Sequence, residues 1–296
     1  MTRHARVLAL IAVVCGIALS GVTRSEPRER MTAFGYTVLE GDFHVHGFPD
    51  GILPWDAVRE ARRRRLDVIA LTSHNSMRGW WLWKYAPSSL AKADGVIVLP
   101  GEELTSVGYH MAVVGVTSTI PWHQPLPGAA AAAHAQGALA ILAHPSGEAL
   151  RRRLTEEWLR SVDGVEVAHP GKDALQGTRT DFIDAYRRAL ALNPRVAAIG
   201  SSDFHYFAAI GMSRTFLFVR EATPDGVFEA IRAGRTAACD GRGRSYGPSE
   251  LAGAVADRCR AAASDPPAGD TIAARVGTAL AWAGLAALVL LGPSRR

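Results

Sequence analysis

The sequence predicts an α/β barrel-like domain with parallel strands, and two observations carry this prediction. Between Tyr36 and about Ala237, short apolar runs alternate with helical patterns, as in a sheet covered by helices. Several of these runs end next to histidines or carboxylates. In such barrels the functional side chains gather at the carboxyl ends of the strands, so the pattern also predicts where a site lies.

Seven apolar runs have the length and composition of buried strands. They are residues 66–72, 95–100, 110–116, 138–144, 164–169, 196–200 and 215–219. Helical patterns fall between most of them, at residues 54–65, 127–136, 152–161 and 178–192. At 296 residues the chain is long enough for one large barrel-type domain or two small ones, and length alone does not choose. From the alternation we predict one domain over residues 36–240, followed by a linker or tail over 241–270 that includes the sequence ASDPPAGD.

The composition excludes a disordered chain, since 48% of the residues are hydrophobic and 21% are charged. The net charge of +5 comes largely from arginine. The densest basic run, residues 62–65, closes a helical pattern and is typical of a solvated helix face. No stripe of alternating basic and aromatic residues follows it, so the charge pattern does not indicate a nucleic-acid partner.

Both ends of the chain carry apolar segments. Residues 1–24 begin with a basic stretch and continue into an apolar run from Val7 to Val22, which predicts a signal peptide cleaved after Ser20 or a membrane anchor. Residues 271–292 are apolar apart from Arg275 and predict a transmembrane helix, with a buried C-terminal helix as the alternative. The basic C-terminus would stay in the cytoplasm. We therefore expect an exported, membrane-anchored protein with its domain outside the cytoplasm.

The chain has three cysteines and no CxxC pair, which excludes a cysteine-based zinc site. In an exported domain, Cys239 and Cys259 could form a disulfide.

Six of the ten histidines lie at or beside the ends or starts of predicted strands. His44 and His46 are two residues apart in an extended segment, so both imidazoles point to one face and can bind one metal ion. The other candidates near strand ends or starts are His74, Glu103, His110, His144, Asp203 and His205. Glu102 is the rival of Glu103, and the spacing from Gly101 favours Glu103. Nitrogen and carboxylate ligands without thiolates suit zinc, manganese or iron.

The ordered motifs GDFHVH, SHN, PGEE, AHP and SSDFH resemble those of the polymerase and histidinol phosphatase (PHP) family of metal-dependent phosphoesterases. The resemblance covers about two-thirds of the chain. It implies a distorted (β/α)7 TIM-like barrel of the PHP type, with two or three divalent ions (Zn, Mn or Fe) at its strand ends.

The resemblance also implies a distribution of metal ligands. One ion would take His44, His46, Glu103 and Asp203, and Glu103 would bridge to a second ion held by His110 and His144. A third ion would take Asp50, His74 and His205. Among these residues, Glu103, Asp203 and His205 are the predicted catalytic residues. Ser73 stands where the family usually has an aspartate, and the gap from His46 to Asp50 is shorter than usual.

We therefore predict a metal-dependent hydrolase, and more specifically a phosphoesterase that acts on a small molecule. No GxSxG elbow, P-loop or dinucleotide glycine motif is present. The alternatives are a carboxyl-ester, carbamate or amide hydrolase of the same fold, and a non-catalytic, membrane-tethered metal-binding module.

Several roles stay open at this level. Lys172, Arg179 and Arg214 are candidates to bind a phosphate, or plain surface residues. The aromatic cluster at residues 80–85 could form a wall over the site, part of the core, or a membrane-facing patch. Glu166 could accept a hydrogen bond from a ligand histidine or form an ion pair in the barrel interior. His169 could approach the substrate or lie at the surface, and the surface is the default expectation.

Overall fold

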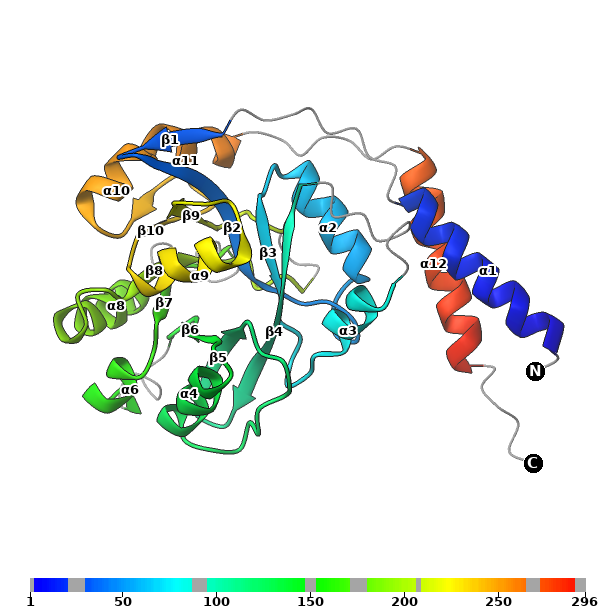
Figure 1. The fold of residues 1–296 in the computed structure, drawn as a ribbon, viewed down its shortest axis with the longest axis horizontal. Helices are drawn as coiled ribbons and strands as arrows, with labels where there is room; N and C mark the ends of the chain where they lie inside the picture. The colour runs from blue at the N-terminus through cyan, green and yellow to red at the C-terminus, as the bar shows by residue number, and fades with distance from the viewer. Residues whose placement is uncertain are drawn as a thin grey trace.

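The computed structural model describes residues 3–20, 30–86, 95–146, 153–170, 180–205, 209–264 and 272–290. Within these ranges one sheet has the strand order β11-β10-β9-β2-β3-β4-β5-β6-β7-β8, and β1 pairs with β2 (Figure 1). The strands are β1 Met31–Ala33, β2 Tyr36–Val45, β3 Val68–Leu71, β4 Ile97–Ser106, β5 Tyr109–Val114, β6 Leu139–Ala143, β7 Gly164–Ala168, β8 Ala197–Gly200, β9 Arg214–Val219, β10 Thr236–Cys239 and β11 Ser245–Tyr246. All seven predicted strands are present.

The sheet curls into a nearly closed barrel because β8 returns against β9 and β10. The Gly200 backbone N–H donates to Oγ1 of Thr215 at 3.0 Å. A Cβ at Gly200 would lie only 2.4 Å from the carbonyl oxygen of Arg214, so this close approach requires glycine.

The strands are mixed in direction, and the prediction of parallel strands is wrong in this respect. β2, β3 and β4 are parallel, as are β6, β7 and β8. β5 is antiparallel to both β4 and β6, and β9 is antiparallel to β2 and β10. Only Val107 and Gly108 separate β4 from β5, and a parallel crossover needs a dozen or more residues.

Helices cover the outside of the barrel (Figure 1). The described helices are α1 Arg3–Ser20, α2 Pro54–Arg63, α3 Arg78–Lys84, α4 Leu126–Ala135, α6 Glu156–Arg160, α8 Thr180–Leu192, α9 Pro224–Arg232, α10 Ser249–Ala254, α11 Ala256–Ser264 and α12 Ile272–Leu290. The region predicted as a linker contains β11, α10 and α11. Val255 and Cys259 of this region are buried against β9 and β10, and a Cys239–Cys259 disulfide ties it to the barrel. Residues 265–270 lie outside the described part.

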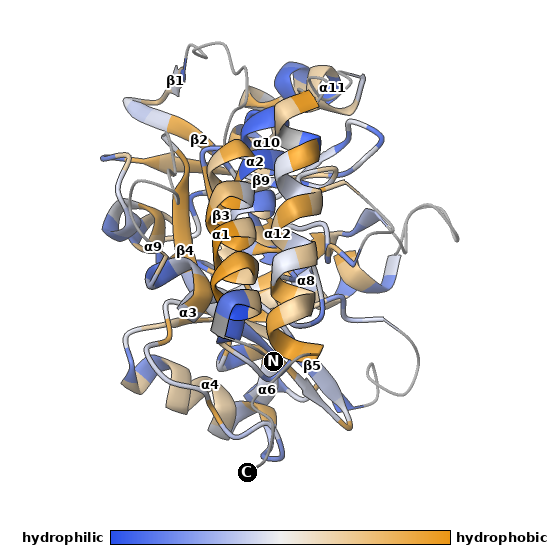
Figure 2. Cartoon of the chain, turned by 90° about the vertical axis from the view of Figure 1, so that its right-hand side faces the viewer, coloured by the Kyte–Doolittle hydropathy of each residue, from blue (hydrophilic) through white to orange (hydrophobic). Residues whose placement is uncertain are grey.

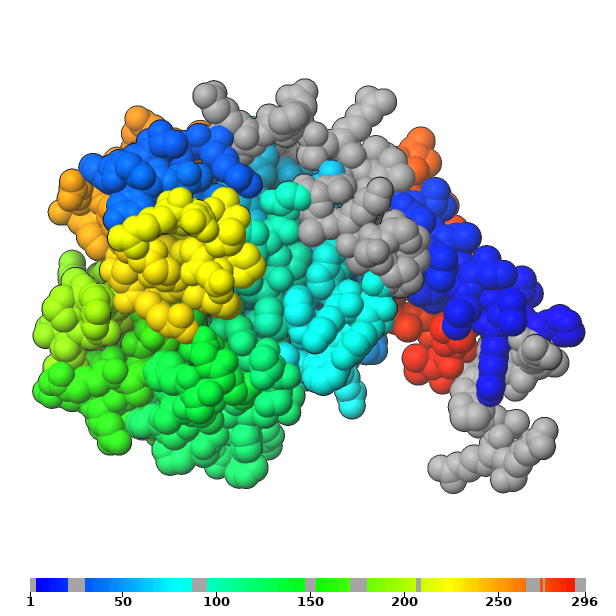
Figure 3. Space-filling model, viewed as in Figure 1, coloured from blue at the N-terminus to red at the C-terminus, as the bar shows by residue number. Residues whose placement is uncertain are grey.

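The two terminal helices pack against each other at one side of the barrel (Figures 1 and 3). Small residues bring their backbones together, since a Cβ at Gly277 would lie 2.3 Å from the Ser20 backbone nitrogen. Arg59 of α2 donates to Oγ1 of Thr278 at 2.6 Å and so links the pair to the barrel. Leu8 and Ile272 are exposed on this pair. Figure 2 shows that much of both helices is hydrophobic.

Within the described ranges, no helix combines the length and apolar character needed to span a bilayer. The transmembrane helix predicted over residues 271–292 is therefore not supported. Arg275 divides the apolar run of α12, whereas a span needs about 20 predominantly apolar residues. Residues 21–29, which would follow the predicted cleavage after Ser20, lie outside the described part.

Candidate metal centre

Side chains from the ends of several barrel strands converge on one point. His44 and His46 come from β2 and the residue after it, and both side chains are fully buried. Their Nε2 atoms lie 3.3 and 3.1 Å from Oδ1 of Asp203, which follows β8. Alternation along the extended chain places both imidazoles on the inner face, as the sequence predicts.

Glu103 of β4 lies at the middle of the group. Its Oε1 is 2.8 Å from Nδ1 of His110 and 3.2 Å from Nε2 of His144. Its Oε2 is 2.6 Å from Nδ1 of His74 and 3.5 Å from Nε2 of His46. The buried carboxylate therefore faces different imidazoles with each oxygen, as a bridging ligand does.

Glu102, the rival of Glu103, points to the opposite face of β4. Its Oε1 accepts a hydrogen bond from the Ile120 backbone at 2.6 Å. Burial raises the pKa of Glu102 to about 7.

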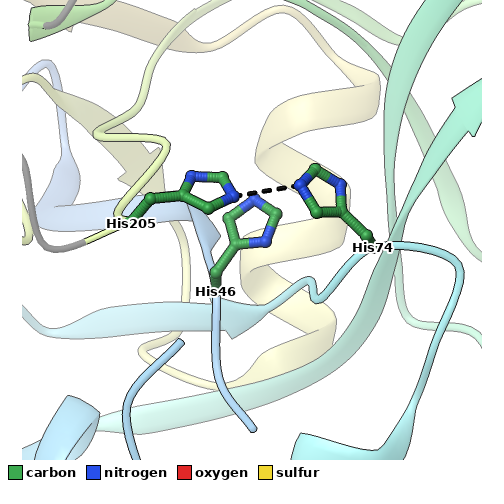
Figure 4. A group of neighbouring side chains, drawn as sticks. All are labelled: His46, His74 and His205. Atoms are coloured by element: carbon green, nitrogen blue, oxygen red, sulfur yellow. Dashed lines mark hydrogen bonds between the residues drawn. The ribbon is translucent and has the colours of Figure 1, made fainter. Parts of the chain in front are cut away.

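The structure forms three groups whose potential ligand atoms lie within 4.8 Å of one another. Two of them are the sets implied by the family resemblance: His44, His46, Glu103 and Asp203, and Glu103, His110 and His144. The third contains His46, His74 and His205. Figure 4 shows these three imidazoles turned toward one another, with Nε2 of His205 and Nε2 of His74 3.0 Å apart.

Asp50 is not part of the third group, although it was predicted there. Its Oδ2 accepts a hydrogen bond from the His74 backbone at 2.6 Å and lies 3.5 Å from Nδ1 of His46. Asp50 therefore contacts two members of the group from outside it.

The chemistry of these groups fits divalent ions. The Nε2 atoms of His44 and His46 and Oδ1 of Asp203 are buried without a hydrogen-bond partner among the described residues. Such buried polar atoms are costly unless another group satisfies them. A cation shared by these atoms would do so, and it would neutralise the carboxylates of Glu103 and Asp203.

Electrostatics couple the same groups. Burial alone would lower the pKa of His44, but the carboxylates of Asp203, Glu103 and Glu166 raise it well above its usual value. For Glu103, burial alone would raise the pKa, but His44 and hydrogen bonds from His110 and His144 hold it well below its usual range. The pKa of Asp203 is likewise lowered, against the effect of burial, mainly by His44 and His169.

Backbone geometry at the strand ends is unusual. His144 and Asp203 have positive φ values of 27° and 47°, in a region that non-glycine residues rarely adopt. Asp42 helps to hold the segment that contains Asp203, since its side chain accepts hydrogen bonds from the backbone N–H groups of Ser202 at 3.1 Å and Gly211 at 2.8 Å. Burial raises the pKa of Asp42 despite these hydrogen bonds.

His169 lies in the site, although the sequence favoured a surface position over one near the substrate. It is buried rather than at the surface, and its Nε2 lies 2.9 Å from Oδ2 of Asp203. It follows directly after β7, so it lies at the same rim as the other histidines. That position after a predicted strand was the available signal.

The remaining open candidates separate clearly. Arg214 is buried, and its Nη1 donates to Oε2 of Glu40 at 2.6 Å, so it is an interior ion-pair residue of β9. Lys172 and Arg179 lie outside the described residues. Trp80 packs against the hydrophobic core. Trp83 packs against the apolar cluster between the barrel and the two terminal helices, whereas Trp81 is exposed. The aromatic cluster is thus partly core.

Comparisons with known proteins agree with this geometry. The model of a PHP-associated family matches residues 181–236. A two-domain protein from Bacteroides vulgatus that contains a predicted PHP-like metal-dependent phosphoesterase has a similar structure, with a TM-score of 0.62, 25% identity, and coverage of 78% of this chain and 72% of that one. PsfC from Pseudomonas syringae shares the fold, with a TM-score of 0.50, 17% identity, and coverage of 75% and 98%.

Among curated proteins, the uncharacterized protein MJ1587 of Methanocaldococcus jannaschii is 26% identical over 142 residues, covering 44% of this chain and 81% of that protein. The matches confirm the resemblance to the PHP family. The chain has the nearly closed α/β barrel of PHP-like metal-dependent phosphoesterases, with histidine and carboxylate clusters that could bind metal.

Proposed function

We propose that this protein is a phosphoesterase that uses two or three divalent ions, of zinc, manganese or iron, to hydrolyse a small-molecule phosphoester. The observation that carries the proposal is the position of Glu103, whose two carboxylate oxygens face imidazoles of all three potential ligand groups. The similarity to the Bacteroides vulgatus protein supports a phosphoester as the substrate class.

The site has a closed floor and an open rim. His44, His46 and Glu103 have fully buried side chains, whereas the side chains of His74, His110 and His205 are 35%, 32% and 26% exposed. A substrate therefore reaches the centre from the side of the last three histidines. Ions bound here would lower the pKa of a water molecule and stabilise negative charge on the phosphoester oxygens.

The chain's own residues then have distinct tasks. The carboxylates of Glu103 and Asp203 would supply the negative charge that binds divalent cations here. Nδ1 of His205 lies 3.2 Å from Oδ1 of Asp203, which orients its Nε2 toward His74 at the rim. Because His205 is partly exposed and turned toward the centre, it is placed to contact both an ion and the substrate.

The test is elemental analysis of the purified full-length chain, followed by assays with an aryl phosphodiester, an aryl phosphomonoester and an aryl carboxyl ester. Bound zinc, manganese or iron with phosphoester turnover is the expected result. Turnover of the carboxyl ester alone would replace the proposal by an ester hydrolase of the same fold. Bound metal without turnover of any of the three compounds would indicate a non-catalytic metal-binding module, and a chain that takes up no metal would overturn the proposed metal centre.

We also propose that the domain works outside the reducing cytoplasm. The support is the Cys239–Cys259 disulfide between β10 and α11, because disulfides persist mainly in oxidising compartments. The test labels free cysteine thiols with an alkylating reagent of low membrane permeability, in intact cells and at the moment of lysis. If Cys239 and Cys259 are both labelled as free thiols in the lysed cells, this location is contradicted.

A further inference from the structure

Glu166 lies beneath the centre and belongs to none of the three ligand groups. It is a fully buried residue of β7. Its Oε1 lies 2.9 Å from Nδ1 of His44. Its Oε2 accepts a hydrogen bond from the backbone N–H of His144 at 2.7 Å. One carboxylate thus contacts a residue of the first ligand group and a residue of the second.

Both contacts affect how a ligand is presented. Nε2 of His44 faces Glu103 and Asp203, and it can bind an ion only if Nδ1 carries the proton. An acceptor at Nδ1 enforces that tautomer. The contact at His144 holds the backbone at a positive φ of 27°, which a residue with a Cβ adopts only when its surroundings hold it there.

We infer that Glu166 is a positioning residue that fixes His44 and His144 together and so couples the two ligand groups that share Glu103. The inference rests on the proposed metal centre. Sequence reasoning left Glu166 open between this role and an interior ion pair. Its two oxygens are each engaged by a donor from a different strand end, which an isolated ion pair does not require.

This role requires a carboxylate, because both contacts need an acceptor. The amide of Glu166→Gln has one acceptor oxygen and one NH2 group, which can only donate. If its oxygen faces His44, its NH2 group opposes the N–H of His144. If it is flipped, the NH2 group donates to Nδ1 of His44, and the proton moves to Nε2, the ligating atom. Neither arrangement preserves both ligands.

The experiment is a cobalt titration of the full-length chain, followed by visible absorption, for the wild type, Glu166→Gln and the matched control Glu102→Gln. Glu102 is also a buried glutamate, but only its Oε1 accepts a hydrogen bond among the described contacts, so a glutamine retains that contact. We expect Glu166→Gln to weaken cobalt binding by about 10- to 100-fold and to change the absorption band. Glu102→Gln should match the wild type.

Thermal unfolding of the metal-free proteins separates positioning from a structural role. A folded Glu166→Gln variant with wild-type cobalt affinity and spectrum would overturn the inference and leave the proposed function standing. Cobalt binding by the wild type without phosphoester turnover would overturn the proposed function and leave this inference standing. If Glu166→Gln does not fold, Glu166→Asp serves in its place, since it keeps both acceptors but shortens the reach, and unchanged affinity there would also overturn the inference.

Discussion

Oε1 of Glu103 lies 2.8 Å from Nδ1 of His110, a contact that joins β4 to β5 beneath the open rim. The antiparallel register places Thr105 opposite His110 and Glu103 opposite Ala112. Glu103 and His110 therefore lie diagonally on the same face of a tight hairpin, and their side chains meet. This hairpin supplies Glu103, the potential ligand that the first two groups share, and His110 of the second group.

Replacement of Glu103 by glutamine is expected to remove bound metal and to lower activity by more than about 100-fold. Loss of a residue that only hydrogen-bonds a metal ligand lowers affinity or activity by about 10- to 100-fold, and loss of the ligand itself should cost more. The amide keeps the volume but loses the charge that bridges the groups. Elemental analysis and phosphoester turnover measure both effects, with Glu102→Gln as the control. Retention of metal and turnover in Glu103→Gln would contradict the ligand assignment.

His169→Ala is expected to weaken metal binding by about 10- to 100-fold, because Oδ2 of Asp203 loses the donor that orients it. His169→Gln should restore most of the affinity, since a glutamine amide can present an N–H near the position of Nε2. Zinc affinity measured by competition with a chelator tests both variants. Equal affinity in His169→Ala and the wild type would show that Asp203 needs no such partner.

Metal affinity is expected to rise with pH. His44 has a raised pKa in the folded, metal-free protein, so below that pKa an ion must displace a proton. Affinity should then increase about tenfold per pH unit for each proton displaced, and level off above the raised pKa. Chelator competition over a pH series measures this slope, and affinity independent of pH would argue against His44 as a ligand.

The pKa shifts of His44 and Glu103 also predict how the stability of the metal-free protein depends on pH. His44 contributes stability that is full below its unfolded pKa of about 6.5 and is lost as pH rises through its raised folded pKa. The lowered pKa of Glu103 gives a contribution that is present above about pH 4.3 and lost as pH falls through the folded value. Urea unfolding should therefore show highest stability between these limits.

Loss of the disulfide in a Cys239→Ala, Cys259→Ala double variant is expected to cost about 3 kcal/mol, because the bond closes a loop with a sequence separation of 20 residues. The loss should loosen α10, which lies within that loop, and α11, which carries Cys259, more than the metal centre. Urea unfolding and metal content measure the two effects. A large loss of metal with unchanged stability would contradict this separation.

Much of the fold could be predicted because its strands are short, apolar and bounded by turn residues. Strand direction could not be predicted from the alternation alone, and the tight turn at Val107 and Gly108 was overlooked as a hairpin signal. The proline- and glycine-containing sequence ASDPPAGD indicates a linker, whereas the short helices α10 and α11 before it carry little signal of their own. Their stability comes from packing around Cys259, a long-range contact.

The sequence by itself predicted which histidines and carboxylates gather at the strand ends, because imidazoles spaced two apart lie on one face of a strand and several carboxylates follow apolar runs. Only the tertiary structure decided which oxygen of Glu103 faces which histidine, that Asp50 lies outside the third group, and that Glu166 contacts His44 and His169 contacts Asp203. The physical reason is that periodicity fixes the face on which a side chain lies. Distances between strands far apart in sequence depend on how the whole sheet curls and closes.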